Sequence, residues 1–371
     1  MAISFVSFVS AVLLPLLVSA VQSAPTRRCV AVAGSTGRVG RLVVNELLNN
    51  ENYVVKALSR DLSKAKRILP QSESIQLVKC DLSDASQVSR AFRDVDAIIW
   101  CASGFSADSN WYDKLLSLFK LKFTPTKTIE MEGIRFVANA LKQQQPQVEN
   151  EEESSSPRFI LCSSAGVTRP SWSEEKKKAF VGAADIPIVR LNPFNILNLK
   201  LQGEDVLRSS GVPYCIVRPC GLNENWPTGR PILSQGDVAV GRSNKESLAR
   251  FMVKLLDEPQ AASKTFECFT LPNYPEPRSY QDQLSRLRSD GEALEESTLA
   301  AEYALLQQLV PGETLAPNQL AMGQTYEQLD KGQTGRLGKR KFSHFISLLL
   351  YLKSLMECSV GGEERLAEVV V

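Results

Sequence analysis

The stretch that most constrains the fold runs from Cys29 to Val44 and reads CVAVAGSTGRVGRLVV. A short apolar run at 30–33 predicts a buried strand, and the apolar residues after the turn have helical spacing. Between them stand three glycines at fingerprint spacing: Gly34, Gly37 and Gly40. A strand, a glycine turn and a helix in this order form the context of a dinucleotide-binding site.

Each glycine of this turn has a separate expected role. Gly34 allows the tight turn, Gly37 lets the backbone approach a pyrophosphate, and Gly40 lets the helix pack closely on the strand. The helix N-terminus offers free N–H groups and a partial positive charge to the phosphates. The alternative is a glycine-rich turn without a ligand. The expected coenzyme contacts of the turn are Gly34, Ser35, Thr36, Gly37, Arg38, Val39 and Gly40.

Charge and histidine content exclude several classes of protein. The net charge of the 371 residues is +2, so a general nucleic-acid-binding surface is not implied and DNA is not an expected partner. The single histidine, His344, lies in the C-terminal tail. A Ser–His or Cys–His catalytic pair in the core is therefore excluded, which removes most hydrolase mechanisms.

The eight cysteines are scattered, without a CxxC pair or the spacing of a zinc knuckle. We therefore expect no metal site. Five of them lie in or beside apolar runs and are expected to be small core residues: Cys80, Cys101, Cys162, Cys215 and Cys220.

Residues 1–24 are uncharged and mostly apolar, and Val21 to Ala24 resembles a small-residue cleavage site. These features predict an ER-type signal peptide, with no stable membrane span after its removal. The alternative is an uncleaved anchor, for which Ile3 to Val18 is near the short limit. The first strand begins near Cys29, which leaves little room for a separate transit peptide.

Apolar runs alternate with helical patterns along the rest of the chain, which predicts a doubly wound parallel sheet. Segment 105–128 is an apolar insertion that could be a lid, a partner-binding helix or extra core, and 143–156 is a polar surface loop. We expect an edge strand at 264–269 and helices at 242–256 and 294–309. The remaining strands are expected at 53–58, 75–79, 97–101, 158–162 and 214–218.

Ligands of such sheets bind outside the carboxyl ends of the strands. Arg60 stands at the end of the second strand, where a basic residue suits a 2′-phosphate and favours NADP over NAD, with Arg38 and Lys64 as helpers. The alternative is that Arg60 is a plain surface charge. Asp81 with Leu82 is placed to meet the adenine, although Asp81 could also cap a helix at 84–92. Further expected coenzyme contacts at this edge are Cys101, Ala102, Ser103, Pro219, Gly221 and Leu222.

Four motifs together resemble the atypical short-chain dehydrogenase/reductase family in its NmrA-like branch. They are GSTGRVG at Gly34, SSAGVTRP at Ser163, KLQGEDVLRSSGVPYCIVRPCGL at Lys200 and KTFEC at Lys264. The second and third are similar to plastid and cyanobacterial members related to complex I intermediate-associated fusion proteins. The resemblance implies a Rossmann-like doubly wound parallel sheet with a small C-terminal substrate-side portion and a helical tail. The expected organisation is a signal peptide at 1–24, an NAD(P)-binding domain at 29–271, and a partly helical or disordered extension at 275–371.

The resemblance also implies a catalytic set. Active members use a Tyr four residues before a Lys, with a Ser that orients the substrate carbonyl. Lys200 stands in the Lys position and binds the nicotinamide ribose, Ser163 or Ser164 stands in the Ser position, and Ile196 occupies the acid position. An isoleucine cannot transfer a proton. In the alternative reading Lys200 only pairs with Glu204 one helical turn later.

Two functions therefore remain open. The first is an NADP(H)-binding plastid factor for redox sensing, assembly or regulation, with little or no Tyr-dependent catalysis and with assembly proteins or RNA as partners. The second is an NADP-dependent oxidoreductase of a small carbonyl or enone, with water or Tyr214 as the proton donor. Plastid residence through an ER-type signal is expected, and the ER lumen or secretion is the alternative.

Overall fold

The computed structural model describes residues 27–103, 128–144, 156–192, 195–223, 225–272 and 274–309. The predicted signal peptide, the apolar insertion up to residue 127, most of the acidic loop and the tail beyond 309 lie outside these described residues. The statements below concern the described part of the chain.

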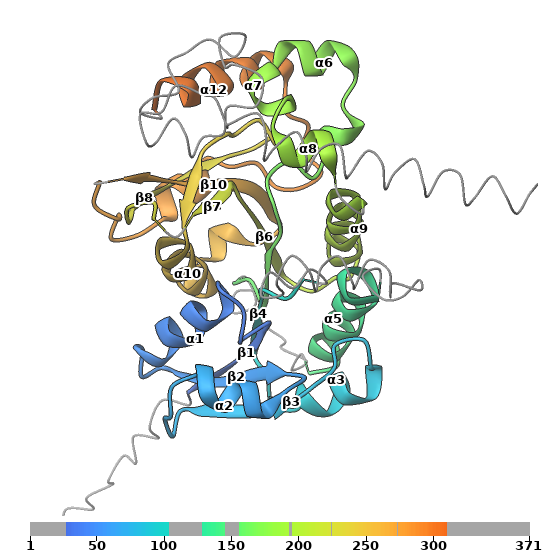
Figure 1. The fold of residues 1–371 in the computed structure, drawn as a ribbon, viewed down its shortest axis with the longest axis vertical. Coiled ribbons are helices and arrows are strands. Elements are labelled where there is room, and N and C mark those ends of the chain that lie inside the picture. The colour runs from blue at the N-terminus through green and yellow to red at the C-terminus, as the bar shows by residue number, and fades with distance from the viewer. Residues whose placement is uncertain are drawn as a thin grey trace, which may run out of the picture.

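The centre of the molecule is an eight-stranded sheet in the order β3-β2-β1-β4-β5-β6-β10-β8 (Figure 1). All neighbouring strands are parallel except β8, which is antiparallel to β10. The order reverses direction at β1 and β4, so the predicted doubly wound α/β fold is confirmed. The strands are β1 (Arg28–Ala33), β2 (Tyr53–Ser59), β3 (Ile75–Lys79), β4 (Ala97–Trp100), β5 (Phe159–Cys162), β6 (Tyr214–Pro219), β8 (Gly229–Ser234) and β10 (Lys264–Pro272).

The far end of the sheet differs from the prediction. The strand expected at the edge is β10, and it lies between β6 and β8, so the edge strand is β8. The pattern of β8 is hard to recognise because it contains Pro231, which cannot donate to a ladder and suits an edge. A second small sheet pairs β7 (Gly221–Asn223) with β9 (Arg242–Asn244) in parallel.

Helices connect the strands and cover both faces of the sheet (Figure 1). Helix α10 begins three residues later than predicted, because 242–244 pair as β9 and Asn244 then caps the helix through its side chain. The helices are α1 (Gly40–Leu48), α2 (Leu62–Ile68), α3 (Ala85–Ala91), α5 (Ile134–Gln143), α6 (Glu174–Ala179), α7 (Val181–Ala184), α8 (Pro187–Leu191), α9 (Ile196–Arg208), α10 (Lys245–Lys254), α11 (Gln281–Ser285) and α12 (Glu296–Leu309). Shorter turns are the π-helix η1 (Thr128–Gly133) and the 3-10 helices η2 (Arg169–Ser171), η4 (Leu255–Asp257) and η5 (Pro259–Ala261).

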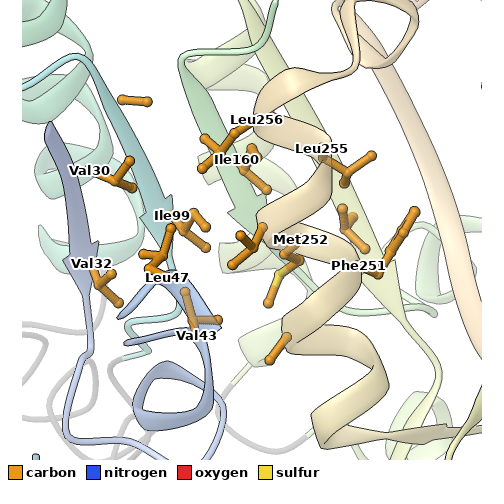
Figure 2. Packing of buried hydrophobic residues seen from close by; sticks show 14 of the residues in the cluster. Val30, Val32, Val43, Leu47, Ile99, Ile160, Phe251, Met252, Leu255 and Leu256 are labelled. Atoms are coloured by element: carbon orange, nitrogen blue, oxygen red, sulfur yellow. The ribbon is translucent and has the colours of Figure 1, made fainter. Parts of the chain in front are cut away.

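Two hydrophobic layers sandwich the sheet. Alternate residues of β1 divide between them: Val30 and Val32 pack with α1 and α10, as Figure 2 shows, whereas Ala31 and Ala33 pack toward α3 and α5. The central strands are buried on both faces, which explains why they read as continuous apolar runs. This burial is the main source of the sheet's stability.

A third hydrophobic cluster joins α12 to the short helices that follow β5. Leu299 and Leu306 of α12 pack with Trp172 and Phe180, and the backbone N–H of Gly182 donates to the Tyr303 hydroxyl at 3.0 Å. Figure 1 shows α12 beside α7, at the end of the molecule away from α2. Residues beyond Pro275 therefore contribute to the packing of the substrate-side portion.

Candidate functional site

The parallel strands β1 to β6 end at one edge of the sheet, and the predicted coenzyme residues follow those ends. The glycine turn follows β1, Arg60 directly follows β2, and Cys101 directly follows β4. Asp81 is the second residue after β3. Ser163 follows β5, and Pro219 is the last residue of β6. The fold thus brings residues from six separate segments to one edge of the sheet, as expected for a switch-point site.

The glycine turn is tightly packed against its surroundings. Gly34 has a φ of +73°, and a Cβ there would lie 2.7 Å from the Ala102 amide nitrogen. A Cβ on Gly40 would lie 2.1 Å from the Gly34 carbonyl oxygen, so only glycine lets α1 start this close to the turn. The predicted turn and packing roles of Gly34 and Gly40 are confirmed. Among the described side chains none caps α1 at Val39. The amides of Arg41 and Leu42 donate to the carbonyl oxygens of Gly37 and Val39, each at 3.0 Å, so the turn folds back on its own backbone.

Arg60 and Asp81 lie at the ends of neighbouring strands. Arg60 is exposed, and its charge is close enough to help lower the pKa of Asp81. The larger cause of that lowered pKa is hydrogen bonding from the Ser83 backbone N–H and hydroxyl, at 3.0 and 2.7 Å. Asp81 does not cap the following helix; Asp84 does so through Ser86 and Gln87. The capping alternative for Asp81 is therefore wrong.

Lys200 lies on the first turns of α9, and its side chain is 15% exposed. Its ammonium is 3.8 Å from the buried carboxylate of Glu130 in η1. The two segments can approach closely because Gly203 has no side chain. A Cβ there would lie only 2.2 Å from the Glu130 carbonyl oxygen. The alternative pairing of Lys200 with Glu204 is wrong, since the Glu204 carboxylate bonds to other groups.

Glu204 is the centre of a buried charged network that the sequence analysis missed. Arg218 donates to both of its carboxylate oxygens, from Nε at 3.0 Å and Nη2 at 2.6 Å. Arg208 donates at 2.9 Å and the Ser163 hydroxyl at 2.5 Å. Burial opposes the Arg218 charge, but the Glu204 carboxylate outweighs it and raises the Arg218 pKa. The available signal was an arginine inside the apolar strand YCIVRP, following a Glu and an Arg at i, i+4 spacing.

This network changes the expected role of the two serines. The Ser163 hydroxyl donates its proton to Glu204, and the side chain is buried. The Ser164 hydroxyl is partly exposed and donates to the Ala165 carbonyl at 3.0 Å. Of the two, Ser164 is the partly exposed one.

No proton donor occupies the acid position. Ile196 is buried one helical turn before Lys200, in a small cluster with Val167, Val189 and Leu197. Tyr214 stands at the first residue of β6, which is the opposite edge of the sheet, and its hydroxyl donates to Asp290 at 2.8 Å. Burial and this hydrogen bond raise the pKa of Tyr214. Tyr214 as an alternative donor is therefore wrong.

A second buried ion pair shapes the loop after β5. The Arg169 guanidinium is fully buried and donates to the carbonyl oxygens of Asp237, Ala183 and Ala239 at 2.6–3.0 Å. The Asp237 carboxylate accepts from the backbone N–H groups of Gly166 and Thr168. The loop from Gly166 to Arg169 is thus fixed to Asp237 by hydrogen bonds.

Neither a metal cluster nor a membrane-spanning helix is found in the described ranges. Within them no three His, Cys, Asp or Glu side chains gather in an arrangement that could hold a metal ion. None of the helices described between residues 27 and 309 combines the length and apolar character needed to cross a bilayer.

A family model described as NAD(P)H-binding matches residues 34–259, from the glycine turn to η5. The chain belongs to this NAD(P)H-binding family. The matched region contains the glycine turn, Lys200 and the Glu204 network, so the site lies inside it. Together with the sheet order, the match identifies a Rossmann-like NAD(P)-binding protein of the atypical short-chain dehydrogenase/reductase type.

Three curated relatives extend this finding. An uncharacterized chloroplastic protein of Arabidopsis thaliana is 27% identical over 270 residues, covering 72% of this chain and 85% of the relative. An uncharacterized sugar epimerase, YhfK of Bacillus subtilis, is 23% identical and covers 64% and 92%. The chloroplastic protein TIC 62 of Pisum sativum is 26% identical over 209 residues, which are 52% of this chain and 32% of that protein.

Proposed function

We propose that this protein binds NADP(H) across the Gly34–Gly40 turn and serves as a redox-sensing, assembly or regulatory factor of plastids rather than as a Tyr-dependent reductase. The single observation that carries the proposal is the pairing of an intact glycine turn with a buried Ile196 in the acid position. Phosphate and ribose contacts do not involve the acid, so coenzyme affinity is retained without hydride chemistry.

The preference for NADP over NAD rests on the end of β2. Arg60 directly follows β2 and is exposed. The nearest carboxylate, that of Asp61, is used to cap α2, where it accepts from the Lys64 backbone N–H at 3.0 Å. A guanidinium suits the 2′-phosphate, whereas an acidic residue would bind the free 2′-hydroxyl. Arg38, also exposed, is the second basic residue of the turn.

The argument against Tyr-route catalysis has three parts, one for each member of the expected set. Ile196 carries no proton, the Ser163 hydroxyl is committed to Glu204, and the Lys200 charge faces the Glu130 carboxylate. Carbonyl reduction needs a proton delivered to the developing alkoxide as hydride arrives. In the described part of the chain the neighbours of Lys200 supply no titratable tyrosine for that step.

The plastid assignment is supported by the chloroplastic relatives and by the predicted N-terminal signal, which would route the chain through the ER. Proteins of plastid assembly complexes, or RNA, are the partner classes of this proposal. The ER lumen or secretion remains the alternative location. A fluorescent fusion that retains the native N-terminus distinguishes them, and lumenal or secreted signal alone would contradict the plastid assignment.

The proposed lack of reductase activity is tested by incubating the protein with NADPH and a panel of small aldehydes, ketones and enones. We expect NADPH to be bound but not consumed above the rate of a heat-denatured control. Turnover that Lys200→Met abolishes would contradict the proposal and support the alternative, an NADP-dependent oxidoreductase with water as proton donor. The variant's NADPH affinity, measured in parallel, separates loss of turnover from loss of binding.

A further inference from the structure

Two cysteines lie opposite each other at the carboxyl edge of neighbouring strands. Cys162 is the last residue of β5, and Cys101 directly follows β4. The parallel register pairs Trp100 with Leu161, so the next residue on each strand is a cysteine facing a cysteine. Neighbouring strands lie about 4.8 Å apart, which is within the Cα separation of about 4.4–6.8 Å that a disulfide spans.

The two side chains point to the same face of the sheet. Ile99 and Ile160 pack toward α1 and α10, as Figure 2 shows, and the following pair, Trp100 and Leu161, packs on the other face. With the period of two along a strand, both cysteines return to the α1 and α10 face, where they contact the same cluster. The Cys101 and Cys162 side chains are hydrogen-bonded to each other.

Exposure separates this pair from most of the other described cysteines. Cys101 and Cys162 are partly exposed, whereas four others are buried: Cys80, Cys215, Cys220 and Cys268. Cys29 is also partly exposed, but it lies near the start of β1, at the opposite edge of the sheet. Among the described cysteines, this pair is therefore the one place where two partly exposed cysteine residues lie opposite each other.

The surroundings divide the pair into a nucleophile and a resolving thiol. The hydrogen bond from Cys101 lowers the pKa of Cys162, and the nearby Lys200 ammonium lowers it further against the effect of burial. The same hydrogen bond and burial raise the pKa of Cys101. The thiolate is the attacking species in disulfide exchange, so Cys162 reacts first.

We propose that Cys101 and Cys162 form a reversible disulfide at the edge where the coenzyme lies, and that oxidation of the pair weakens NADP(H) binding. The first part depends only on the two thiols. The second part rests on the proposed function, because Cys101 is one of the residues expected to contact the coenzyme. The device would couple the thiol redox state of the compartment to occupancy of the nucleotide site.

The oxidant we assign is a low-molecular-weight disulfide such as glutathione disulfide. The Cys162 thiolate attacks one sulfur of the oxidant, forms a mixed disulfide and releases one glutathione thiolate. The Cys101 thiolate then attacks the Cys162 sulfur and releases the second. Two protein thiols lose two electrons and two protons, and one glutathione disulfide becomes two glutathione molecules.

The disulfide is tested by peptide mass spectrometry of the full chain after incubation with glutathione disulfide, with reversal by dithiothreitol. We expect a bridge between the peptides of Cys101 and Cys162 that persists in the Cys29→Ser control. The Cys101→Ser variant should instead keep glutathione on Cys162. An unreacted pair, or stable glutathione adducts on both cysteines of the unaltered protein, would overturn the proposal.

The coupling is tested on the unaltered protein by titrating NADPH into the reduced, oxidised and re-reduced forms. We expect the oxidised form to bind about tenfold more weakly or worse, through loss of the Cys101 contact, and re-reduction to restore the affinity. Equal affinity of the reduced and oxidised forms would overturn the coupling. Failure of the reduced form to bind NADPH would instead refute the proposed function, while the mapped bridge would still stand.

Discussion

The glycine turn after β1 and the α9–β6 region are built in opposite ways. On the side of β1, the turn is made of glycines whose backbone lies against backbone, with a Cβ excluded at Gly34 and Gly40. On the side of α9 and β6, buried charged side chains hold the structure, with Glu204 accepting from Arg218, Arg208 and Ser163. On the first side no described side chain caps the helix that follows the turn, whereas the second side uses its charged side chains on one another.

The difference separates what a binding site requires from what a catalytic site requires. A backbone anion site keeps its function with few side chains, since the helix N-terminus and the amides supply the binding. A catalytic site needs specific side chains free to reach the substrate. Here the charged groups next to the expected catalytic positions are paired for structure, which agrees with a binding protein more than with a reductase.

The largest effect is expected on the charged side. Glu204→Ala removes both hydrogen bonds to the buried Arg218 and leaves Glu267 as its remaining described ion-pair partner, at 3.8 Å, and breaking such a pair costs about 3–5 kcal/mol. Chemical denaturation at neutral pH measures the loss of unfolding free energy. Asp205→Asn is the control, because Asp205 pairs with Arg208 at the surface and should cost less than about 1 kcal/mol. Similar losses for the two variants would show that the network is not the support we describe.

The next largest effect is expected from a substitution in the glycine turn. Gly40→Ala places a Cβ 2.1 Å from the Gly34 carbonyl oxygen, so the turn must shift at a cost of about 1–3 kcal/mol. We expect NADPH affinity to fall with it. Gly229→Ala is the matched control: its Cβ would lie 2.0 Å from the Leu271 carbonyl oxygen, but far along the sheet in β8. Unchanged NADPH affinity in Gly40→Ala, measured by calorimetry on folded protein, would contradict the assigned site.

A sharper test of the coenzyme side concerns specificity. Arg60→Ala removes the guanidinium expected at the 2′-phosphate, and a hydrogen bond to a charged group is worth about 1.5–3 kcal/mol. NADPH affinity should fall about tenfold or more while NADH affinity stays nearly constant. Arg90→Ala, an exposed arginine in the last turn of α3, is the control. Parallel loss of both nucleotides would mean that Arg60 does not recognise the 2′-phosphate.

A separate test concerns the pH dependence contributed by the charged side. Burial, with the charge of Asp237, raises the pKa of Glu267 from its usual 4.5 to about 8. Between these values the folded protein holds a proton that the unfolded chain releases, so stability falls as pH rises from about 5 to about 8, by at most about 1.4 kcal/mol per pH unit. Glu267→Gln should flatten this slope in denaturation midpoints measured at several pH values. An unchanged slope would place the titration elsewhere.

Much of the fold follows from local pattern. The strands β1 to β6 were expected within a residue or two of their observed bounds. The central ones are short apolar runs buried on both faces between turn residues, and the edge strand β3 is a short, partly buried run. The glycine turn was expected for a similar local reason, whereas Lys200 was named from the family resemblance alone. β8 was missed because its Pro-containing pattern makes sense only beside β10, which is contributed from thirty residues away along the chain.

The parts of the site that sequence reasoning missed depend on tertiary contacts. Glu204 was considered only as a partner of Lys200 one turn away, yet its partners come from β5, β6 and its own helix. Glu130 was not considered because nothing in its local sequence indicates that η1 packs against Gly203. The pairing of Cys101 with Cys162 likewise needs the strand order, since 61 positions of sequence separate two residues that the register makes neighbours.

The most direct measurement is a calorimetric titration of the reduced, unaltered protein with NADPH and with NADH under one buffer condition. The account predicts saturable binding of NADPH at one site per chain, with NADH at least about tenfold weaker. Absence of NADPH binding, or an equal or higher affinity for NADH, would contradict it.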